Sequence, residues 1–292
     1  MGYFIRKRWK NRRKCQWTKA VLLWYNEYIG RLWGRLFVFG RENCVRGARS
    51  GPGKGERMYS EVFCKVYNEF GWNYYPEIFG QQLLQWLEQK GLRPRRAMDL
   101  ACGTGVLCEI LHQNGISASG MDFSAGMIEI ARQRNAEIAY DVADMITYRP
   151  EARFDLVTCT GDALNHIADP ADVERIFHNV RSYTAPGGWF IFDILNENEV
   201  STSEPFEMDF SEDLRVWFQM TRPGEKQVNL KIRVYEKGTL KFEENIRETI
   251  HDPDRICGLL RKAGFEVVKC ADRLLDEGNH GTTWFVIARV PD

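Results

Sequence analysis

A glycine turn at residues 98–105, with the sequence MDLACGTG, is the part of the chain best suited to hold a ligand. Residues 96–101 form an apolar run that predicts a buried strand, and the pattern after the turn is that of a helix. The apolar face of this helix is made by Val106, Leu107, Ile110 and Leu111. Gly103 and Gly105 lack side chains, so the backbone of the turn can come close to a ligand. The sequence therefore predicts a small-molecule cradle near a helix N-terminus.

Three acidic residues accompany this turn. Asp99 lies inside the first strand, Asp122 ends the next apolar run, and Asp144 stands where a third strand should end. A carboxylate at the tip of the second strand is suited to bind the two hydroxyls of a ribose. A dinucleotide site would need a third glycine where this chain has Cys108, and this departure disfavours NAD. Each acid alone also fits an ordinary strand end, helix entry or turn, so the prediction depends on their joint position.

The glycine turn and the three acids, at successive strand ends, resemble the motifs of the class I S-adenosylmethionine-dependent methyltransferases. The resemblance implies an enzyme whose cofactor is S-adenosylmethionine. It also implies that Gly103 packs on the methionine part, that Asp122 binds the ribose, and that Asp144 with the Met145 backbone faces the adenine. The predicted cofactor contacts are Tyr67, Asp99, Ala101, Gly103, Gly105, Asp122, Phe123, Met127, Asp144, Met145, Thr160 and Gly161.

Elements on both sides of the turn predict the rest of the core. Residues 59–70 and 76–90 predict two helices ahead of the first strand, which we expect to fold over the cofactor as a lid. Residues 154–160 and 189–194 predict a fourth and a fifth strand. Between them, Asp169 followed by proline predicts a helix start.

Residues 196–250 change character and predict an antiparallel meander. Three runs, at 214–220, 228–235 and 240–249, are separated by turn residues at 223–224 and 237–238. A helix after Asp252 and strands at 265–270 and 283–290 then complete the core. The sequence thus predicts an α/β fold: a Rossmann-like, doubly wound seven-stranded sheet with an antiparallel last strand, an N-terminal helical lid and an inserted antiparallel β meander.

The loop after the fourth strand contains the candidate catalytic residue, His166. Methyl transfer from a sulfonium is an in-line displacement, so the protein mainly has to align a nucleophile and exclude water. A neutral amine needs little further help, whereas a hydroxyl needs a general base. Asp162 and Asn165 share the loop, and Thr160 or Gly161 could contact the cofactor through the backbone. A helix-entry histidine bonded to backbone is the alternative interpretation of His166.

The same loop separates subclasses of the family. DNA and protein-glutamine methyltransferases resemble one another in an Asn/Asp-Pro-Pro-aromatic motif, and this loop has no proline. The chain is more similar to N-methyltransferases of nucleotide-linked amino sugars, which pair a tyrosine on the N-terminal helix with a histidine in this loop. The matching residues here are Tyr67 and His166, and the departure is Asn68, where relatives commonly have Asp. Tyr67 could also be an ordinary core aromatic of the lid helix.

The formal net charge is zero, but the charge is unevenly distributed. Residues 1–57 carry 15 Lys and Arg against three acids, which leaves 25 basic and 37 acidic residues for the remainder. This leader could be a nucleic-acid arm, a membrane-surface helix or an organelle presequence. The interpretation that we favour is translated upstream sequence that is not part of the native protein, with Met58 as the true start.

Four parts are therefore expected in the chain of 292 residues. They are the basic leader at 1–57, the lid and cofactor-binding core at 58–195, the inserted substrate cap at 196–250, and the C-terminal part of the core at 251–292. The eight cysteines have no metal-ligand spacing, which predicts reduced thiols in a cytoplasmic protein without a metal. No apolar run approaches the roughly 20 residues that span a bilayer.

The predicted function is S-adenosylmethionine-dependent methyl transfer to a small-molecule amine or hydroxyl. Two alternatives remain open. One is a nucleic-acid (RNA) methyltransferase that uses the basic leader to hold phosphate. The other is a non-catalytic protein that keeps the cofactor site. The sequence leaves the identity of the acceptor and the oligomeric state open.

Overall fold

The computed structural model describes residues 59, 63–64, 67–68, 71–198, 200, 202, 204–209, 213–275 and 283–292. All of them belong to one structural unit, Val45–Asp292. The predicted leader at 1–57 lies outside the described residues, and so does most of the helix predicted at 59–70. Within the described ranges, no helix is both long and apolar enough to cross a membrane.

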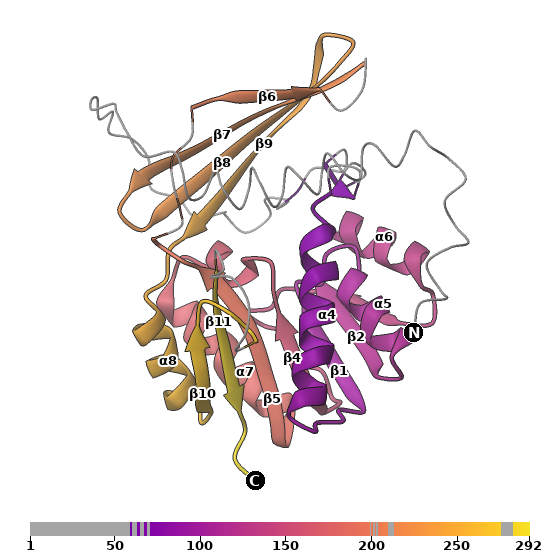
Figure 1. The fold of residues 1–292 in the computed structure, drawn as a ribbon, viewed down its shortest axis with the longest axis vertical. Coiled ribbons are helices and arrows are strands. Elements are labelled where there is room, and N and C mark those ends of the chain that lie inside the picture. Colours follow the sequence, from indigo (N-terminus) through magenta and orange to yellow (C-terminus); the bar gives the residue numbers. More distant parts are fainter. Residues whose placement is uncertain are drawn as a thin grey trace. The chain divides into compact units, whose positions relative to one another are not determined.

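A seven-stranded sheet with the order β10-β11-β5-β4-β1-β2-β3 forms the centre of this unit (Figure 1). Its strands are β1 (Arg96–Leu100), β2 (Ser117–Asp122), β3 (Ala139–Val142), β4 (Phe154–Cys159), β5 (Thr184–Leu195), β10 (Glu266–Ala271) and β11 (Thr283–Arg289). β1 to β5 pair in parallel, and β11 runs antiparallel to both β5 and β10. The strand order reverses between β1 and β4, and ligands of such sheets bind at the carboxyl ends of strands beside this point. The predicted doubly wound sheet with an antiparallel last strand is confirmed.

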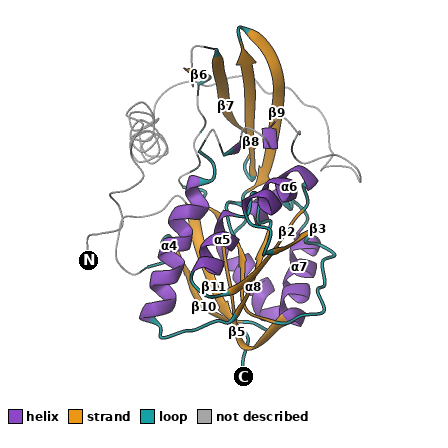
Figure 2. Cartoon of the chain, turned by 90° about the vertical axis from the view of Figure 1, so that its right-hand side faces the viewer, coloured by secondary structure: helices purple, strands orange, loops and turns teal. Residues whose placement is uncertain are grey.

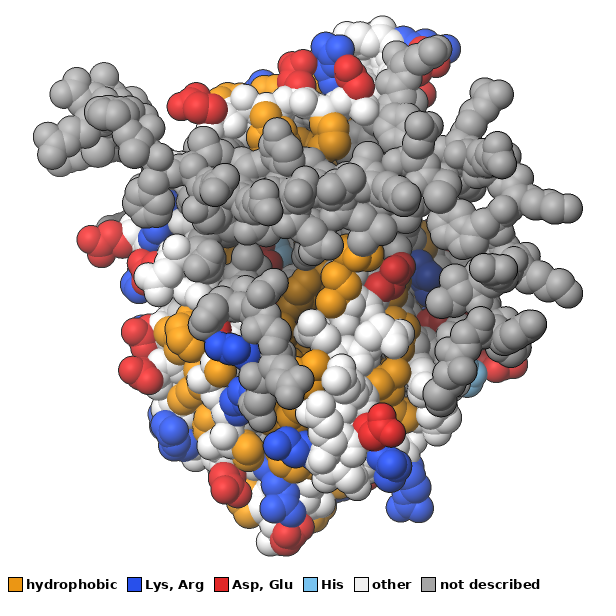
Figure 3. Space-filling view, in the orientation of Figure 1, with side chains coloured by type: hydrophobic (Ala, Val, Ile, Leu, Met, Phe, Trp, Pro, Cys, Tyr) orange, Lys and Arg blue, Asp and Glu red, His pale blue; other side chains and the backbone are white. Residues whose placement is uncertain are grey.

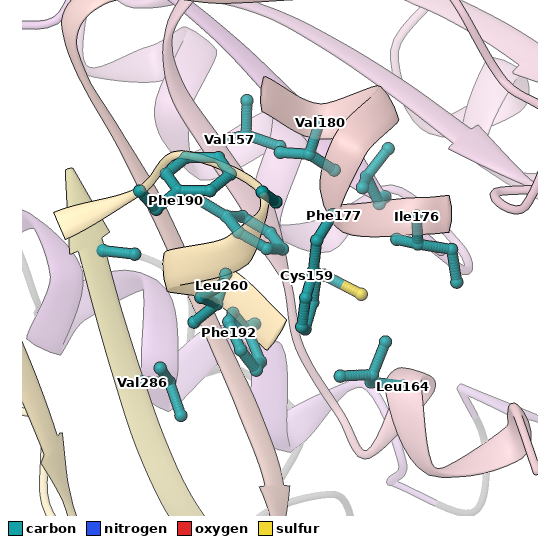
Figure 4. Packing of buried hydrophobic residues seen from close by; sticks show 14 of the residues in the cluster. Val157, Cys159, Leu164, Ile176, Phe177, Val180, Phe190, Phe192, Leu260 and Val286 are labelled. Atoms are coloured by element: carbon teal, nitrogen blue, oxygen red, sulfur yellow. The ribbon is translucent and has the colours of Figure 1, made fainter. Parts of the chain in front are cut away.

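Helices cover both faces of the sheet (Figure 2). α4 (Tyr74–Gln89), α5 (Val106–Gln113) and α6 (Ala125–Arg134) pack on one face, and α7 (Pro170–Tyr183) and α8 (Pro253–Lys262) pack on the other. On the second face, the Phe177 ring of α7 lies 6.0 Å from the ring of Phe190 and 5.6 Å from that of Phe192 (Figure 4). Full burial of one such side chain contributes about 1.5–3 kcal/mol.

Two helix starts follow directly from local sequence. Asp169 and Asp252 each accept a backbone N–H of the first turn, at 2.9 Å in both cases. Pro170 and Pro253 come next, where the helix needs no N–H donor. The predicted starts of α7 and α8 are therefore confirmed.

A second, antiparallel sheet has the strand order β6-β7-β8-β9 and confirms the predicted meander. Its strands are β6 (Phe206–Asp209), β7 (Leu214–Gly224), β8 (Gln227–Glu236) and β9 (Thr239–Thr249). The structure adds β6, which is too short to show a pattern in the sequence. It also moves the first turn: Pro223 and Gly224 belong to β7, and residues 225–226 make the turn.

The two faces of this second sheet differ in chemistry. One face buries apolar side chains, among them Val216, Phe218, Ile232, Val234 and Phe242. Elsewhere the sheet carries ion pairs, such as Arg215 with Asp209 at 2.7 Å and Lys241 with Glu236 at 3.0 Å. Figure 3 shows acidic and basic side chains side by side on this sheet. We call the sheet the cap and its apolar side the inner face.

α4 differs from the predicted lid. Its buried Phe79, Leu83 and Trp86 belong to the same core cluster as Leu111 of α5. Gly80 allows this close packing, because a Cβ there would lie 2.8 Å from Ile110 Cδ1. The helix is thus a layer of the core, and the lid prediction for residues 76–90 is corrected. An amphipathic pattern identifies a buried face but does not say which element covers it.

Candidate active site

The glycine turn has the left-handed backbone that its residue types suggest. Ala101, Gly103 and Gly105 have φ of 54°, 54° and 76°. A Cβ at Gly103 would meet no atom within 4 Å, so this residue faces open space. A Cβ at Gly105 would lie 2.5 Å from the Tyr140 hydroxyl, so Gly105 serves close packing rather than ligand approach. The cradle therefore opens at Gly103.

Asp122 connects the tip of β2 to this turn. Its Oδ2 accepts the Gly103 N–H at 2.9 Å, and its Oδ1 accepts the Ser124 N–H at 2.8 Å. Burial raises the pKa of Asp122, while these two hydrogen bonds act in the opposite direction. The carboxylate is thus held in a defined orientation beside the open side of the turn.

Asp99 lies beneath the turn, and only 3% of it is exposed. Its Oδ1 accepts the Thr158 hydroxyl at 2.6 Å, which links β1 to β4. Burial raises the pKa of Asp99 to about 7. Asp99, a predicted cofactor contact, therefore supports the glycine turn from inside the sheet.

The other predicted cofactor residues differ in exposure. Phe123 is 43% exposed and follows Asp122 directly, so its ring is available to a ligand. Met127 and Met145 are buried in two different core clusters. The Oδ1 of Asp144 accepts the Ile146 N–H at 2.8 Å and so shapes the loop after β3.

The described residues of the N-terminal segment contact the cofactor turn. The Asn68 Oδ1 accepts the Thr104 hydroxyl at 2.9 Å, and the Cys64 sulfur lies 3.5 Å from the Ser124 hydroxyl. Asn68, the departure from relatives, therefore has a definite partner in the glycine turn. These contacts agree with a covering role for the first predicted helix at the positions that the structure describes.

Tyr67 lies between Asp122, at the tip of β2, and Asp162, in the loop after β4. Its ring packs against Phe63 and Trp72, at centroid distances of 5.8 and 5.5 Å. Burial raises the pKa of Tyr67 first, and the charges of Asp122 and Asp162 raise it further. The phenol consequently keeps its proton at neutral pH and can donate a hydrogen bond.

The loop after β4 ends in a short 3₁₀ helix, η2 (Ala163–His166). Gly161 and Asp162 have φ of 76° and 58°. A Cβ at Gly161 would meet only the Tyr75 ring, at 3.9 Å. The Gly161 N–H donates to Asp193 at 3.2 Å, so its carbonyl is the backbone group left for a ligand. Thr160, at the end of β4, is half-buried.

His166 is held against the cap by its ring. Its Nδ1 lies 3.3 Å from the Arg247 carbonyl oxygen in β9. A carbonyl can only accept, so this bond requires the proton on Nδ1 and leaves Nε2 with a free lone pair. Burial lowers the pKa of His166, which favours the neutral ring. His166 therefore makes the backbone bond of the alternative interpretation and still offers a base nitrogen.

Three further polar residues near this loop were missed by sequence reasoning. Asp193 of β5 accepts the Tyr75 hydroxyl and the N–H of Asp162, the latter at 3.0 Å. Glu248 of β9 is close enough for its charge to act on Asp162. An acid inside the apolar strand β5 is a local signal that could have pointed to Asp193. No local pattern indicates Tyr75 or Glu248.

Metal ligation has no support within the ranges that the structure describes. No group of three or more His, Cys, Asp or Glu side chains there could hold an ion. The polar residues of the site are instead arranged around the glycine turn and the loop after β4.

Residues 97–188 match the sequence pattern of the methyltransferase domain family. This segment contains the glycine turn, all three acids and the loop with His166. The core of this chain is a class I methyltransferase domain. Its cofactor is S-adenosylmethionine, and the chain is an S-adenosylmethionine-dependent enzyme.

Curated relatives of this methyltransferase share part of its length. The ubiquinone biosynthesis O-methyltransferase of Bordetella avium (strain 197N) is 27% identical over 191 residues, which are 63% of this chain and 68% of that protein. The protein of the same name from Coxiella burnetii (strain Dugway 5J108-111) is 32% identical over 121 residues. That match covers 39% of this chain and only 50% of the relative.

Solved methyltransferase structures share the fold. An S-adenosylmethionine-dependent methyltransferase from Clostridium acetobutylicum ATCC 824 superposes with a TM-score of 0.68 at 21% identity, over 78% of this chain and 100% of that one. CalS10, an amino pentose methyltransferase from Micromonospora echinaspora, superposes with a TM-score of 0.63 at 20% identity, over 80% and 98% of the two chains.

The geometry of the methyltransferase site fits the cofactor of the family. Gly103 faces space that a Cβ would enter without meeting any atom within 4 Å. Beside it stands the oriented carboxylate of Asp122, which is 7% exposed. A backbone cradle next to an acid at a strand tip suits a ligand that combines a flexible chain with a ribose.

Proposed function

We propose that the chain is a cytoplasmic enzyme that transfers the methyl group of S-adenosylmethionine to an amine or hydroxyl of a small molecule. The observation that carries the proposal is the position of Tyr67, whose phenol is subject to the charges of both Asp122 and Asp162. The cofactor edge and the loop after β4 therefore meet at one side chain. An acceptor bound at this point would lie next to the cofactor.

In this proposal, different residues of the site bind different parts of the cofactor. Gly103 would pack on the methionine part, and Asp122 would accept hydrogen bonds from the ribose hydroxyls. Phe123, which is 43% exposed, and the loop at Asp144 would face the adenine. The bound cofactor supplies an electrophilic methyl group on a sulfonium.

The cap supports a small acceptor over a nucleic-acid duplex. Phe63 of the N-terminal segment, Met127 of α6 and Phe242 of the cap belong to one buried cluster. The cap therefore packs its inner face onto the elements that carry the cofactor edge. An apolar surface that faces the cofactor-binding elements suits a small molecule better than a duplex.

The names of similar proteins agree with either acceptor chemistry. Curated relatives are O-methyltransferases of ubiquinone biosynthesis, and the CalS10 neighbour is an amino pentose methyltransferase. For a hydroxyl acceptor, the Nε2 of His166 would serve as the general base. For an amine, His166 and Tyr67 would mainly orient the nucleophile.

Cofactor binding tests the first part of the proposal. We expect Gly103→Val to abolish S-adenosylmethionine binding in a calorimetric titration, because its side chain would fill the cradle. Asp122→Ala should weaken binding by about 1.5–3 kcal/mol through loss of a charged acceptor. The matched control is Gly115→Val: Gly115 also has a positive φ of 80° and no neighbour within 4 Å, but it precedes β2, at the opposite end from the site. Equal affinity in Gly103→Val and Gly115→Val would contradict the assignment.

Turnover tests the second part. His166→Ala and Tyr67→Phe should each lower the release of S-adenosylhomocysteine about 100-fold with amine or alcohol acceptors. Their affinity for the cofactor should stay close to that of the wild type, because neither substitution alters Gly103 or Asp122. Full turnover in both variants would mean that alignment by other groups suffices.

A further inference from the structure

Three carboxyl groups gather at one corner of the candidate site. Asp193 of β5 accepts the N–H of Asp162 at 3.0 Å, which joins β5 to the loop after β4. Glu248 of β9 is brought to the same loop by the residues on either side of it. The Asn165 side-chain NH₂ donates to the Thr249 carbonyl at 2.7 Å, and the His166 Nδ1 lies 3.3 Å from the Arg247 carbonyl.

The three carboxyls are unequally supplied with hydrogen bonds. Asp193 accepts from the Tyr75 hydroxyl and from the N–H groups of Gly161 and Asp162. The Oδ1 of Asp162, in contrast, exposes less than 1 Å² and has no hydrogen-bond partner among the residues that the structure describes. A buried carboxylate oxygen without a donor is costly, so this atom calls for a ligand that brings one.

Glu248 reaches the same loop from the cap and is half-buried. Burial raises the pKa of Asp162 well above its usual range and that of Glu248 to about 7. The negative charges of Asp193 and Glu248 both repel that of Asp162 and raise its pKa further. The carboxyls therefore resist ionising together, and a bound cation would stabilise their ionised forms.

The surroundings of these carboxyls are apolar and aromatic. On β9, Phe242, Glu244, Ile246 and Glu248 share the inner face of the cap, so two glutamates lie among its apolar side chains. Tyr59 is subject to the charge of Glu248, and Tyr67 is subject to that of Asp162. Aromatic rings beside carboxylates form a common environment for organic ammonium groups.

We propose that Asp162 and Glu248 bind the ammonium group of a basic amine and accept its proton, which makes the methyl acceptor an amine and not an alcohol. The inference rests on the proposed function and specifies its substrate class. Asp193 acts as a positioning residue, since it holds the loop through the Gly161 and Asp162 N–H groups.

The proposed step is balanced in atoms and charge. An R–NH₃⁺ group loses one proton to the carboxylate pair and becomes R–NH₂. The nitrogen lone pair then forms the new N–C bond to the methyl group, while the S–C bond of the sulfonium breaks and its electron pair stays on sulfur. The products are R–NH₂–CH₃⁺ and the neutral thioether, and the proton on the carboxyl pair is released to solvent. In this scheme His166 orients the amine.

The test compares two probes of the same shape, benzylamine and benzyl alcohol, by calorimetric titration into the full chain saturated with S-adenosylhomocysteine. Benzylamine is cationic at neutral pH, and benzyl alcohol is not. We expect benzylamine to bind at least tenfold more tightly. Asp162→Asn and Glu248→Gln should each remove most of this preference, while Glu243→Gln should retain it. Glu243 lies on the same strand but faces away, where it pairs with Arg233 at 2.5 Å.

Either of two results would overturn the inference: equal affinity for the two probes in the wild type, or a preference that survives in both Asp162→Asn and Glu248→Gln. Retained S-adenosylhomocysteine affinity in each variant shows that it is folded. The proposed function fails by a different readout, the loss of cofactor binding or of all methyl transfer in the wild type. The probe ratio is measured without turnover, so the two failures are distinguishable.

Discussion

Asp99 illustrates how burial changes the behaviour of one motif residue. It is 3% exposed, and its pKa is raised by burial to about 7. In the unfolded chain an aspartate ionises near pH 4. Between about pH 4 and 7 the native protein therefore holds a proton that the unfolded chain has released. Its free energy of unfolding decreases as pH rises through this window.

We expect Asp99→Asn to remove this contribution. Asn keeps an oxygen that can accept the Thr158 hydroxyl but does not titrate. Urea unfolding at about pH 5 and about pH 7 should show the variant gaining stability relative to the wild type as pH rises. The other buried acids are present in both proteins and cancel in the difference. A difference that is the same at both pH values would contradict the raised pKa.

At the scale of elements, Asn165 joins three of them. It belongs to η2, its NH₂ donates to the Thr249 carbonyl of β9 at 2.7 Å, and its Oδ1 accepts the Leu195 N–H of β5 at 3.1 Å. The side chain is completely buried. Asn165 therefore connects the cap to the core at the place where the candidate acceptor site lies.

Asn165→Ala should lower the free energy of unfolding by about 1–3 kcal/mol for each backbone partner left unsatisfied. It should also weaken benzylamine binding, because the hydrogen bond that holds Thr249, the residue after Glu248, would be lost. Binding of S-adenosylmethionine at Gly103 should be retained. The control is Asn245→Ala, an exposed position on β9. Thermal unfolding and the two titrations measure these effects, and similar behaviour of the two variants would contradict a connecting role.

At the scale of the whole molecule, the charge separates into a basic leader and an acidic remainder. The described residues of the core contain the cradle, the loop after β4 and the inner face of the cap. We therefore expect a chain that begins at Met58 to bind S-adenosylmethionine as tightly as the full chain, measured by calorimetry. A large loss of affinity would assign the leader a part in the site. RNA binding that only the full chain shows, and that weakens steeply with salt, would favour the nucleic-acid alternative.

Local patterns in the sequence determined most of the core and the cofactor edge. The run at 96–101, the glycines at 103 and 105 and the acid at 122 predicted β1, its turn and the tip of β2, all of which the structure contains. Asp169 and Asp252 predicted two helix starts in the same way. These predictions succeeded because periodicity, capping and turn conformation depend on residues that are neighbours along the chain.

The tertiary structure alone decided which distant residues share a site. Tyr75 and Asp193 are 118 positions apart, and Asn165 and Thr249 are 84 apart, yet each pair is joined by a hydrogen bond. The same limit explains α4, whose pattern predicted a buried face but not its place on the sheet. Periodicity reports that a side chain is buried, whereas its partners depend on strand order, register and the placement of the cap. Those are properties of the whole folded chain, and no short segment contains them.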